Sequence, residues 1–139
     1  MAKCSTEAWN EWLKKNICSN NCIVWSGLIE RNSLQFWAVY SKELDLICPS
    51  IEDIGIMSEI FKGSQKDSLN FNLGIKEFHL IHAFHDWLFA TDKNGGSGLL
   101  AFKTSRFFII VIYSDCFMLS GIIFNKVSQT ARGLMNIGL

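Results

Sequence analysis

The chain has 139 residues, of which 49 % are apolar, and it carries 13 basic and 13 acidic side chains. This length and composition suit one compact domain, over residues 1–139, with a substantial hydrophobic core. The formal net charge of zero and the pI near 6.8 exclude a long-range field that would attract nucleic acid or an anionic membrane, so the expected partner is another protein.

The N-terminal segment is predicted to form a helix that begins after a cap at Ser5 and ends near Asn16. An acidic residue stands near its positive end and two lysines stand near its negative end, an arrangement that the helix dipole favours. Trp9 and Trp12 are three residues apart, and Trp9 and Leu13 are four apart. One face of this helix therefore carries large apolar side chains.

The next predicted element is a hairpin. Its strands run from Cys22 to Ser26 and from Leu34 to Tyr40, and both contain β-branched or aromatic residues. The polar segment over residues 29–33 should connect them.

A second helix is predicted after Pro49, the only proline of the chain, with Ser50 as its cap and an end near Phe61. Gly63 then supplies a stop signal. The apolar residues of this segment recur at helical spacing and should face a core. They are Ile51, Ile54, Met57, Ile60 and Phe61.

The second half of the chain contains five short predicted strands. They run from Leu69 to Leu73, Lys76 to Ala83, Trp87 to Thr91, Gly98 to Thr104 and Phe107 to Ile112. Short segments with turn residues separate them, which favours antiparallel pairing of neighbours.

A final helix is predicted from a cap at Ser120 to near Gly138. Its apolar stripe comprises Ile123, Val127, Ala131 and Leu134. The apolar run over residues 107–124 resembles a membrane span in length, but Ser114 and Asp115 interrupt it, and a carboxylate is costly at the centre of a bilayer. We interpret the run as a buried strand, a turn and the start of this helix.

These elements predict an α+β fold: a central antiparallel β-sheet of about seven strands, with helices on both of its faces. The sequence contains no internal repeat and no low-complexity linker. Its cysteines are odd in number and irregularly spaced, unlike those of secreted disulfide scaffolds, which indicates a reducing cytosol. They are Cys4, Cys18, Cys22, Cys48 and Cys116. The first residues resemble neither a secretion signal nor a myristoylation signal.

Three patterns suggest metal or phosphate binding, and each is incomplete. His79, His82 and His85 are regularly spaced, but alternating strand side chains should place His79 and His82 on opposite faces. Cys18 and Cys22 have no second pair for a zinc site, so we expect ordinary thiols there. The glycine-rich segment over residues 94–98 lacks the lysine of a phosphate-binding loop. We expect no metal and no cofactor.

No nucleophile beside a base, and no pair of carboxylates in one predicted cleft, marks a catalytic site. We therefore expect no enzymatic activity. An enzyme that uses the histidine string remains a third hypothesis; it would require a metal or an activity that removal of His82 abolishes.

The tryptophans at positions 9, 12 and 37 suit a different chemistry. Proline-rich segments present free carbonyls and few amide donors, so their receptors combine flat apolar surfaces with N–H or O–H donors. Indole side chains provide both. Burial in a core is the alternative for such an aromatic stripe.

The order of elements and several local strings resemble those of the profilin family of actin-monomer-binding proteins. Ala8-Trp9-Asn10-Glu11-Trp12 is similar to the N-terminal W-x-x-Y motif of that family. Ile23-Val24 with Phe36-Trp37-Ala38 is similar to its first hairpin, and residues 49–55, 98–105 and 120–126 are similar to later segments. Each string is weakly specific, but together they cover nearly the whole chain.

The resemblance implies that the terminal helices lie on one face of the sheet and the internal helix on the other. It also implies a groove for proline-rich partners, formed by Trp9, Trp12, Trp37, Leu134 and Leu139. Gly133 stands where the family often has histidine, and Leu139 stands where many members have tyrosine. Both lose a polar group, so weaker or altered binding of proline peptides is expected.

The family's actin-binding face implies a second set of residues. It comprises Glu77, His79, His82, Lys93, Met118, Leu119, Gly121, Asn125 and Gln129. Glu77 stands where a basic residue is usual, and His82 where arginine is common, so we expect slower association with actin. The basic set of Lys103, Arg106, Lys126 and Arg132 is sparse for phosphoinositide binding.

The first hypothesis is therefore a cytoplasmic protein of the cytoskeleton that binds monomeric actin and proline-rich proteins and so regulates actin polymerisation. The alternative is a divergent adaptor with weak or no actin binding that uses the groove for another protein or a lipid. Glu77 and Leu119 favour this alternative. An actin assembly assay separates the two hypotheses.

Overall fold

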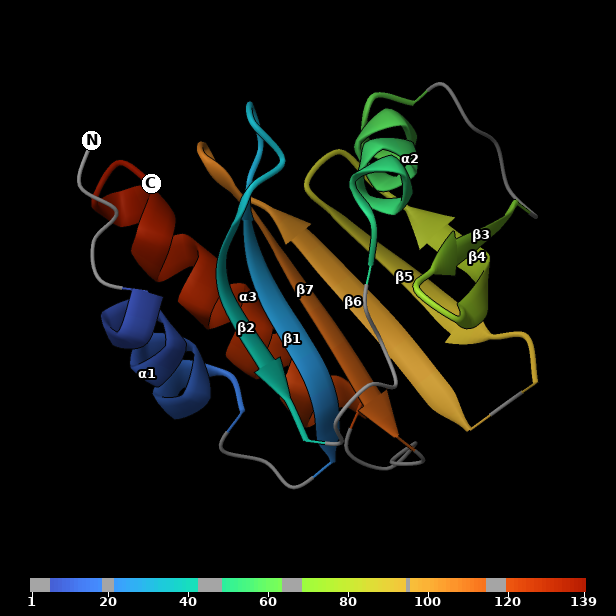
Figure 1. Cartoon of the computed structure of the whole chain (residues 1–139), viewed down its shortest axis with the longest axis horizontal. Coiled ribbons are helices and arrows are strands. Elements are labelled where there is room, and N and C mark those ends of the chain that lie inside the picture. The colour runs from blue at the N-terminus through green and yellow to red at the C-terminus, as the bar shows by residue number, and fades with distance from the viewer. Residues whose placement is uncertain (1–5, 19–21, 43–48, 64–68, 95, 115–119) are drawn as a thin grey trace.

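The computed structural model describes residues 6–18, 22–42, 49–63, 69–94, 96–114 and 120–139. The described residues form one antiparallel sheet of seven strands in the order β2-β1-β7-β6-β5-β4-β3, together with three helices. Figure 1 shows α1 and α3 side by side on one face of the sheet and α2 on the other. The α+β prediction is confirmed, including the placement of the helices.

The elements begin and end close to the predicted positions. The helices are α1 (Thr6–Asn16), α2 (Ile51–Phe61) and α3 (Ser120–Asn136). The strands are β1 (Ile23–Glu30), β2 (Phe36–Ser41), β3 (Asn70–Leu73), β4 (Lys76–Ala83), β5 (Trp87–Asp92), β6 (Ser97–Lys103) and β7 (Phe107–Ser114). The predicted cap at Ser5 lies outside the described residues.

The largest difference concerns β1, which continues through Ile29 and Glu30. The prediction placed both residues in a polar connector. In the structure they pair with Phe108 and Phe107 of β7, and Ile29 is fully buried. The long partner strand therefore extends β1 beyond the end that local polarity suggested.

The position of β7 inside the sheet, between β1 and β6, explains why its residues form an apolar run. Alternate side chains of this strand enter two different cores, one on each face of the sheet. Phe108, Ile110 and Ile112 face the core under α2, whereas Phe107, Ile109, Val111 and Tyr113 face the core under α1 and α3. The prediction of a buried strand is confirmed, and no described helix is long and apolar enough to cross a membrane.

A capping box fixes the start of α2. The Ser50 hydroxyl accepts a hydrogen bond from the Asp53 amide at 3.1 Å, and the Asp53 carboxylate accepts one from the Ser50 amide at 3.0 Å. The same carboxylate oxygen accepts a bond from the Gly74 amide at 2.9 Å, in the turn between β3 and β4. Asp53 thus ties the helix to the sheet.

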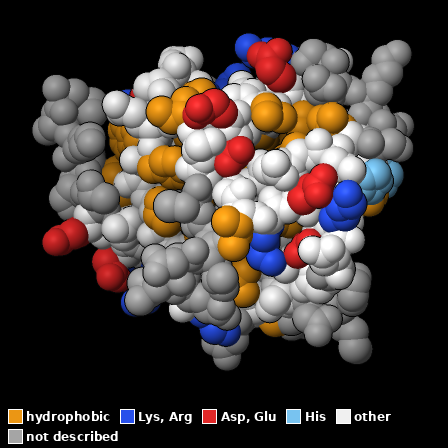
Figure 2. Space-filling model, turned by 45° about the vertical axis from the view of Figure 1, so that its right-hand side comes forward, with side chains coloured by type: hydrophobic (Ala, Val, Ile, Leu, Met, Phe, Trp, Pro, Cys, Tyr) orange, Lys and Arg blue, Asp and Glu red, His pale blue; other side chains and the backbone are white. Residues whose placement is uncertain are grey.

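The predicted core face of α2 is correct except at its first residue. Ile54, Met57, Ile60 and Phe61 are buried, but Ile51 is 62 % exposed. The start of α2 extends past the core cluster. Ile51 therefore follows the helical spacing of the apolar residues but is not packed in the core. In a view turned toward this side, Figure 2 shows hydrophobic side chains at the surface in separate groups, with acidic and basic side chains between them.

A β-bulge in β4 corrects the prediction about the histidines. Leu80 pairs with Ala90, but His82 pairs with Phe89, so Ile81 is an extra residue in the ladder. His79 pairs with Thr91, two residues from Phe89. The bulge therefore places His79 and His82 on the same face of the sheet. Among the described residues, no group of three His, Cys, Asp or Glu side chains could hold a metal ion.

The two described cysteines differ in state. Cys18 is a free, half-buried thiol, and burial raises its pKa to about 12, against a smaller lowering by a hydrogen bond with the Ser26 side chain. Cys22 is disulfide-bonded. The expectation of ordinary thiols is therefore wrong for Cys22.

Candidate functional site

The three tryptophans of the predicted proline groove come together from α1 and β2. The rings of Trp12 and Trp37 each lie 5.6 Å from the ring of Trp9, with interplanar angles of 75° and 70°. Such edge-to-face contacts are favourable for aromatic pairs. All three side chains are half-buried, so they are neither sealed in the core nor free in solvent. We refer to Trp12, Trp9 and Trp37 as the tryptophan row.

Two contacts position this row on the sheet. The Asn10 side-chain oxygen accepts a hydrogen bond from the Val39 amide at 3.0 Å, which attaches α1 to β2. The buried Phe107 ring lies 5.9 Å from Trp9 and 5.0 Å from Trp37, beneath both. The row is therefore supported by a hydrogen bond between the Asn10 side chain and the β2 backbone on one side and by the core on the other.

Hydrogen-bond donors are less accessible than the tryptophan content suggests. The Trp9 indole nitrogen is buried and has no partner among the described residues. A ligand carbonyl cannot reach this N–H without movement of the ring, because the atom has almost no exposed surface. Trp9 therefore contributes an aromatic edge and not an outward donor.

Arg106 adds a cation to the end of the row, which the sequence did not reveal. Its guanidinium lies 4.7 Å from the centre of the Trp37 ring, a cation–π distance. Two of its nitrogens bond to one Glu30 oxygen at 3.1 and 3.0 Å. Hydrogen bonds from Ser33 and from Arg106 lower the pKa of Glu30 below its ordinary value.

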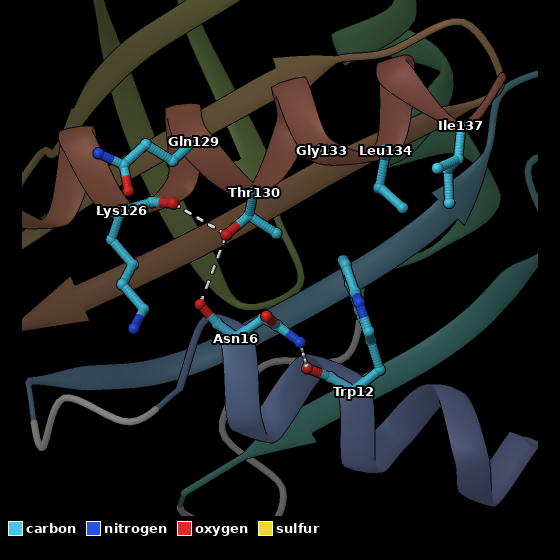
Figure 3. Close-up of a pocket in the computed structure, with 8 residues that line it drawn as sticks. All are labelled: Trp12, Asn16, Lys126, Gln129, Thr130, Gly133, Leu134 and Ile137. Atoms are coloured by element: carbon cyan, nitrogen blue, oxygen red, sulfur yellow. Dashed lines mark hydrogen bonds between the residues drawn. The ribbon is translucent and has the colours of Figure 1, made fainter.

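A groove of about 440 Å³ lies between α1 and α3 next to the row. Figure 3 shows Trp12 rising from α1 toward Leu134 and Ile137, while Asn16 and Lys126 lie at the other end. The Thr130 hydroxyl bonds to the Lys126 carbonyl at 2.9 Å and to the Asn16 carbonyl at 3.5 Å, which links the two helices. The groove has an apolar end and a polar end.

Leu134 and Leu139 complete the predicted set at this site. Leu134 is only 3 % exposed and belongs to the core beneath the groove. The Leu139 oxygen accepts hydrogen bonds from the Thr104 hydroxyl at 2.8 Å and from the Arg106 amide at 2.6 Å. The structure thus brings all five predicted groove residues against one core cluster.

The described residues among those predicted for actin binding lie in β4, directly after β5 and in α3. The Glu77 carboxylate and the Lys93 ammonium form an ion pair at 3.5 Å, and His79 contacts the Asn70 side chain at 2.8 Å. The exposed members are His82, Lys93, Gly121, Asn125 and Gln129. Gln129 also lines the groove beside α1. Met118 and Leu119 lie outside the described residues.

Sequence reasoning missed an aromatic cluster beside these residues, formed by Phe84, Trp87, Phe102 and Phe124. The Trp87 ring lies 4.7 Å from Phe84, 4.8 Å from Phe124 and 6.2 Å from Phe102. A signal existed, because Trp87 and Phe89 are two residues apart and flank the buried Leu88, as expected for one face of a strand. The contribution of Phe124 from α3 could not be predicted from the local sequence, because α3 is distant from Trp87 in the chain.

A smaller pocket of about 170 Å³ adjoins the aromatic cluster. Trp87, Phe102 and Phe124 form part of its wall. Asp86 and Arg132 also line it, as does Lys103, whose ammonium lies 5.9 Å from the Phe61 ring on the other face of the sheet. The cluster therefore has both an apolar surface and a recess with charges of both signs.

Comparison with known proteins finds one matching family model and a set of solved structures with a similar fold. The family model described as Profilin matches residues 7–139. No match was found among the curated protein sequences.

Among solved structures, Acanthamoeba castellanii profilin II aligns with a TM-score of 0.79 at 19 % identity, over 94 % of this chain and 99 % of that one. LokiProfilin2 in its complex with rabbit actin aligns with a TM-score of 0.71 at 12 % identity, over 94 % of this chain and 97 % of that one. Mouse profilin IIa, in complex with a double repeat from the FH1 domain of mDia1, aligns with a TM-score of 0.70 at 14 % identity, over 94 % and 99 %. At these identities the matches establish the fold.

Proposed function

Because this chain belongs to the profilin family, we propose that it binds monomeric actin and proline-rich proteins and thereby regulates actin polymerisation. Profilins are a non-enzymatic, actin-binding family, so the activity is one of binding, competition and delivery, without covalent chemistry and without a cofactor. We place it in the cytoplasm, at the actin cytoskeleton. One surface would bind actin, and a second surface would bind the proline-rich partner.

The single observation that carries the proposal is the tryptophan row beside an open groove. Each of the three half-buried indoles offers a flat apolar face, and their edge-to-face contacts hold the rings in place, so that a proline-rich segment can pack onto them. Such a segment is already extended when free, so it loses little conformational entropy on binding. We assign Trp9, Trp12, Trp37, Leu134 and Leu139 to this surface.

For actin, we assign the face of β4 and β5 together with the first turns of α3. The described residues in this assignment are Glu77, His79, His82, Lys93, Gly121, Asn125 and Gln129; Met118 and Leu119 are assigned from the sequence. A profilin of the same fold has been solved in complex with rabbit actin, which supports the choice of partner. The Glu77–Lys93 ion pair cancels charge on this face, so long-range attraction should be weak.

An actin assembly assay tests the proposal. Addition of the protein to pyrene-labelled actin should lower the amount of filament in proportion to its concentration, and sedimentation should leave more actin in the supernatant. In parallel, poly-proline should change the tryptophan fluorescence in a saturable way. Binding of poly-proline with no effect on actin would instead support the divergent adaptor, for which the neutral Glu77–Lys93 pair is the favouring observation.

Phosphoinositide binding should be weak. Arg106 is engaged by Glu30, Lys126 lines the groove beside α1, and Lys103 and Arg132 line the pocket at the aromatic cluster. These cations do not form one patch, and each cation near an anionic surface contributes only about 1 kcal/mol. Sedimentation with vesicles that contain phosphoinositides should recover little protein at physiological salt.

A further inference from the structure

Besides the Glu77–Lys93 ion pair, the surface assigned to actin contains a group of aromatic side chains with one exposed member. Phe84 is 49 % exposed and stacks on Trp87, with 4.7 Å between ring centres and an interplanar angle of 31°. Trp87 in turn contacts Phe124 of α3 edge-on at 4.8 Å. Three rings from a hairpin turn, a strand and a helix therefore form one chain of contacts, which is exposed at Phe84 and half-buried at Trp87 and Phe124.

The backbone holds this surface in place. The Phe84 amide donates to the Trp87 carbonyl at 2.8 Å, which closes the turn between β4 and β5. Trp87 pairs with Phe102 of β6, and their rings lie 6.2 Å apart. The rings are thus pre-positioned by a sheet ladder, so a partner would not have to order them on binding.

The cluster is continuous with the residues assigned to actin. The His82 ring lies 5.9 Å from the Phe84 ring, and Asn125 follows Phe124 in α3. The charges nearby are balanced: Glu77 pairs with Lys93, and the adjoining pocket contains Asp86 together with Arg132. An apolar anchor with balanced charges around it resembles the centre and rim of a protein interface.

We propose that Phe84, Trp87 and Phe124 anchor the actin monomer on this chain and that apolar contact, rather than charge, provides most of the affinity. This inference rests on the proposed actin binding and specifies how the contact is made. Aromatic residues that border a recess commonly dominate the energy of an interface. The balanced charges predict an association that depends little on salt.

Two substitutions test the anchor by measurement of the dissociation constant for actin that has been made unable to polymerise. Phe84→Ala removes an exposed ring and should preserve the fold, whereas Trp87→Ala removes the central ring; each should weaken binding by about tenfold or more. Trp87→Phe should recover part of the loss. Circular dichroism and thermal unfolding of each variant verify that it is folded.

Ile75→Ala is the matched control, because Ile75 is an apolar side chain with 77 % exposure in the turn that Asp53 joins to α2. It should leave actin binding unchanged. Raising the ionic strength from about 0.05 to about 0.3 M should alter the dissociation constant of the unchanged protein by less than about threefold.

The outcomes separate this inference from the proposed function. If the unchanged protein binds actin but folded Phe84→Ala and Trp87→Ala bind equally well, or if salt weakens binding by tenfold or more, the anchor is wrong and the actin function stands. Equal weakening by Ile75→Ala would also overturn the anchor. If the unchanged protein does not bind actin, both are overturned.

Discussion

Gly133 leaves space in the groove that a donor side chain could fill. A Cβ atom added at this position would meet no atom within 4 Å, and the side of α3 around it is exposed. The groove is lined by Trp12 and Leu134 there, and Thr130 lies one helical turn away. The missing side chain therefore matters for recognition and not for packing.

We expect Gly133→His to bind poly-proline about fivefold more tightly, since one added hydrogen bond contributes on the order of 1 kcal/mol. The control is Gly133→Ala, which should raise stability by about 0.5–1 kcal/mol because glycine disfavours a helix interior, without a change in affinity. Fluorescence titration gives the affinities. Equal affinities for the histidine and alanine variants would show that the groove gains nothing from a donor here.

Burial of the Cys18 thiol makes stability depend on pH. The folded-state pKa of about 12 lies above the ordinary value of 9.0, so the fold favours the neutral thiol. The resulting stabilisation is full below about pH 9 and is lost as the pH rises toward 12. Between pH 8 and 11, the free energy of unfolding should fall less in Cys18→Ala than in the unchanged protein. Parallel curves from urea unfolding would contradict this assignment.

Element boundaries depend on partners that local sequence does not contain. The capping box of α2 was predictable, since Ser50 and Asp53 are three residues apart. The end of β1 was not, because its extension comes from pairing with β7. The bulge at Ile81 was equally hidden, since it exists only in the ladder with β5.

The candidate site also has a part that could be predicted from the sequence and a part that could not. The tryptophan row was predictable because two of its members lie on one helix turn and the resemblance to a family supplied the third. Arg106 and the aromatic cluster were not, because their contacts join residues far apart in the chain, such as Arg106 with Trp37 and Trp87 with Phe124. Local periodicity predicts which face a side chain takes, but not what it meets.

Asp53 connects two elements, and its removal should affect both. Asp53→Ala deletes the bonds to the Ser50 and Gly74 amides and should lower the free energy of unfolding by about 1–2 kcal/mol. The control is Glu52→Ala, because Glu52 is an exposed acid in the same helix turn. This substitution should change the free energy of unfolding by less than about 0.5 kcal/mol. Chemical denaturation measures both. Similar losses would mean that the carboxylate acts only through the helix dipole.

At the scale of the molecule, the two proposed surfaces lie toward opposite edges of one sheet. The tryptophan row involves α1 and β2, whereas the aromatic cluster involves the turn between β4 and β5 and the start of α3 (Figure 1). In the strand order, β1, β7 and β6 separate β2 from β5. Actin and a proline-rich partner should therefore be able to bind the chain at the same time.

We expect saturating poly-proline to change the dissociation constant for actin by less than about twofold, because Gln129 is the one assigned residue that the two sites share and largely separate sites are nearly independent. Titration of actin into the protein, with and without the peptide, measures this. A shorter proline peptide is a control for steric crowding by its ends. Loss of actin binding with both peptides would show that the surfaces overlap or are coupled.

The extra residue in β4 has a consequence for how this family can diverge. Deletion of Ile81 would restore simple alternation and leave every cross-strand pair of β4 and β5 in place, with His82 still opposite Phe89. A change in chain length by a single codon could thus be absorbed at this point of β4 without altering which side chains face a partner. Relatives could then differ in length here and keep the same binding face.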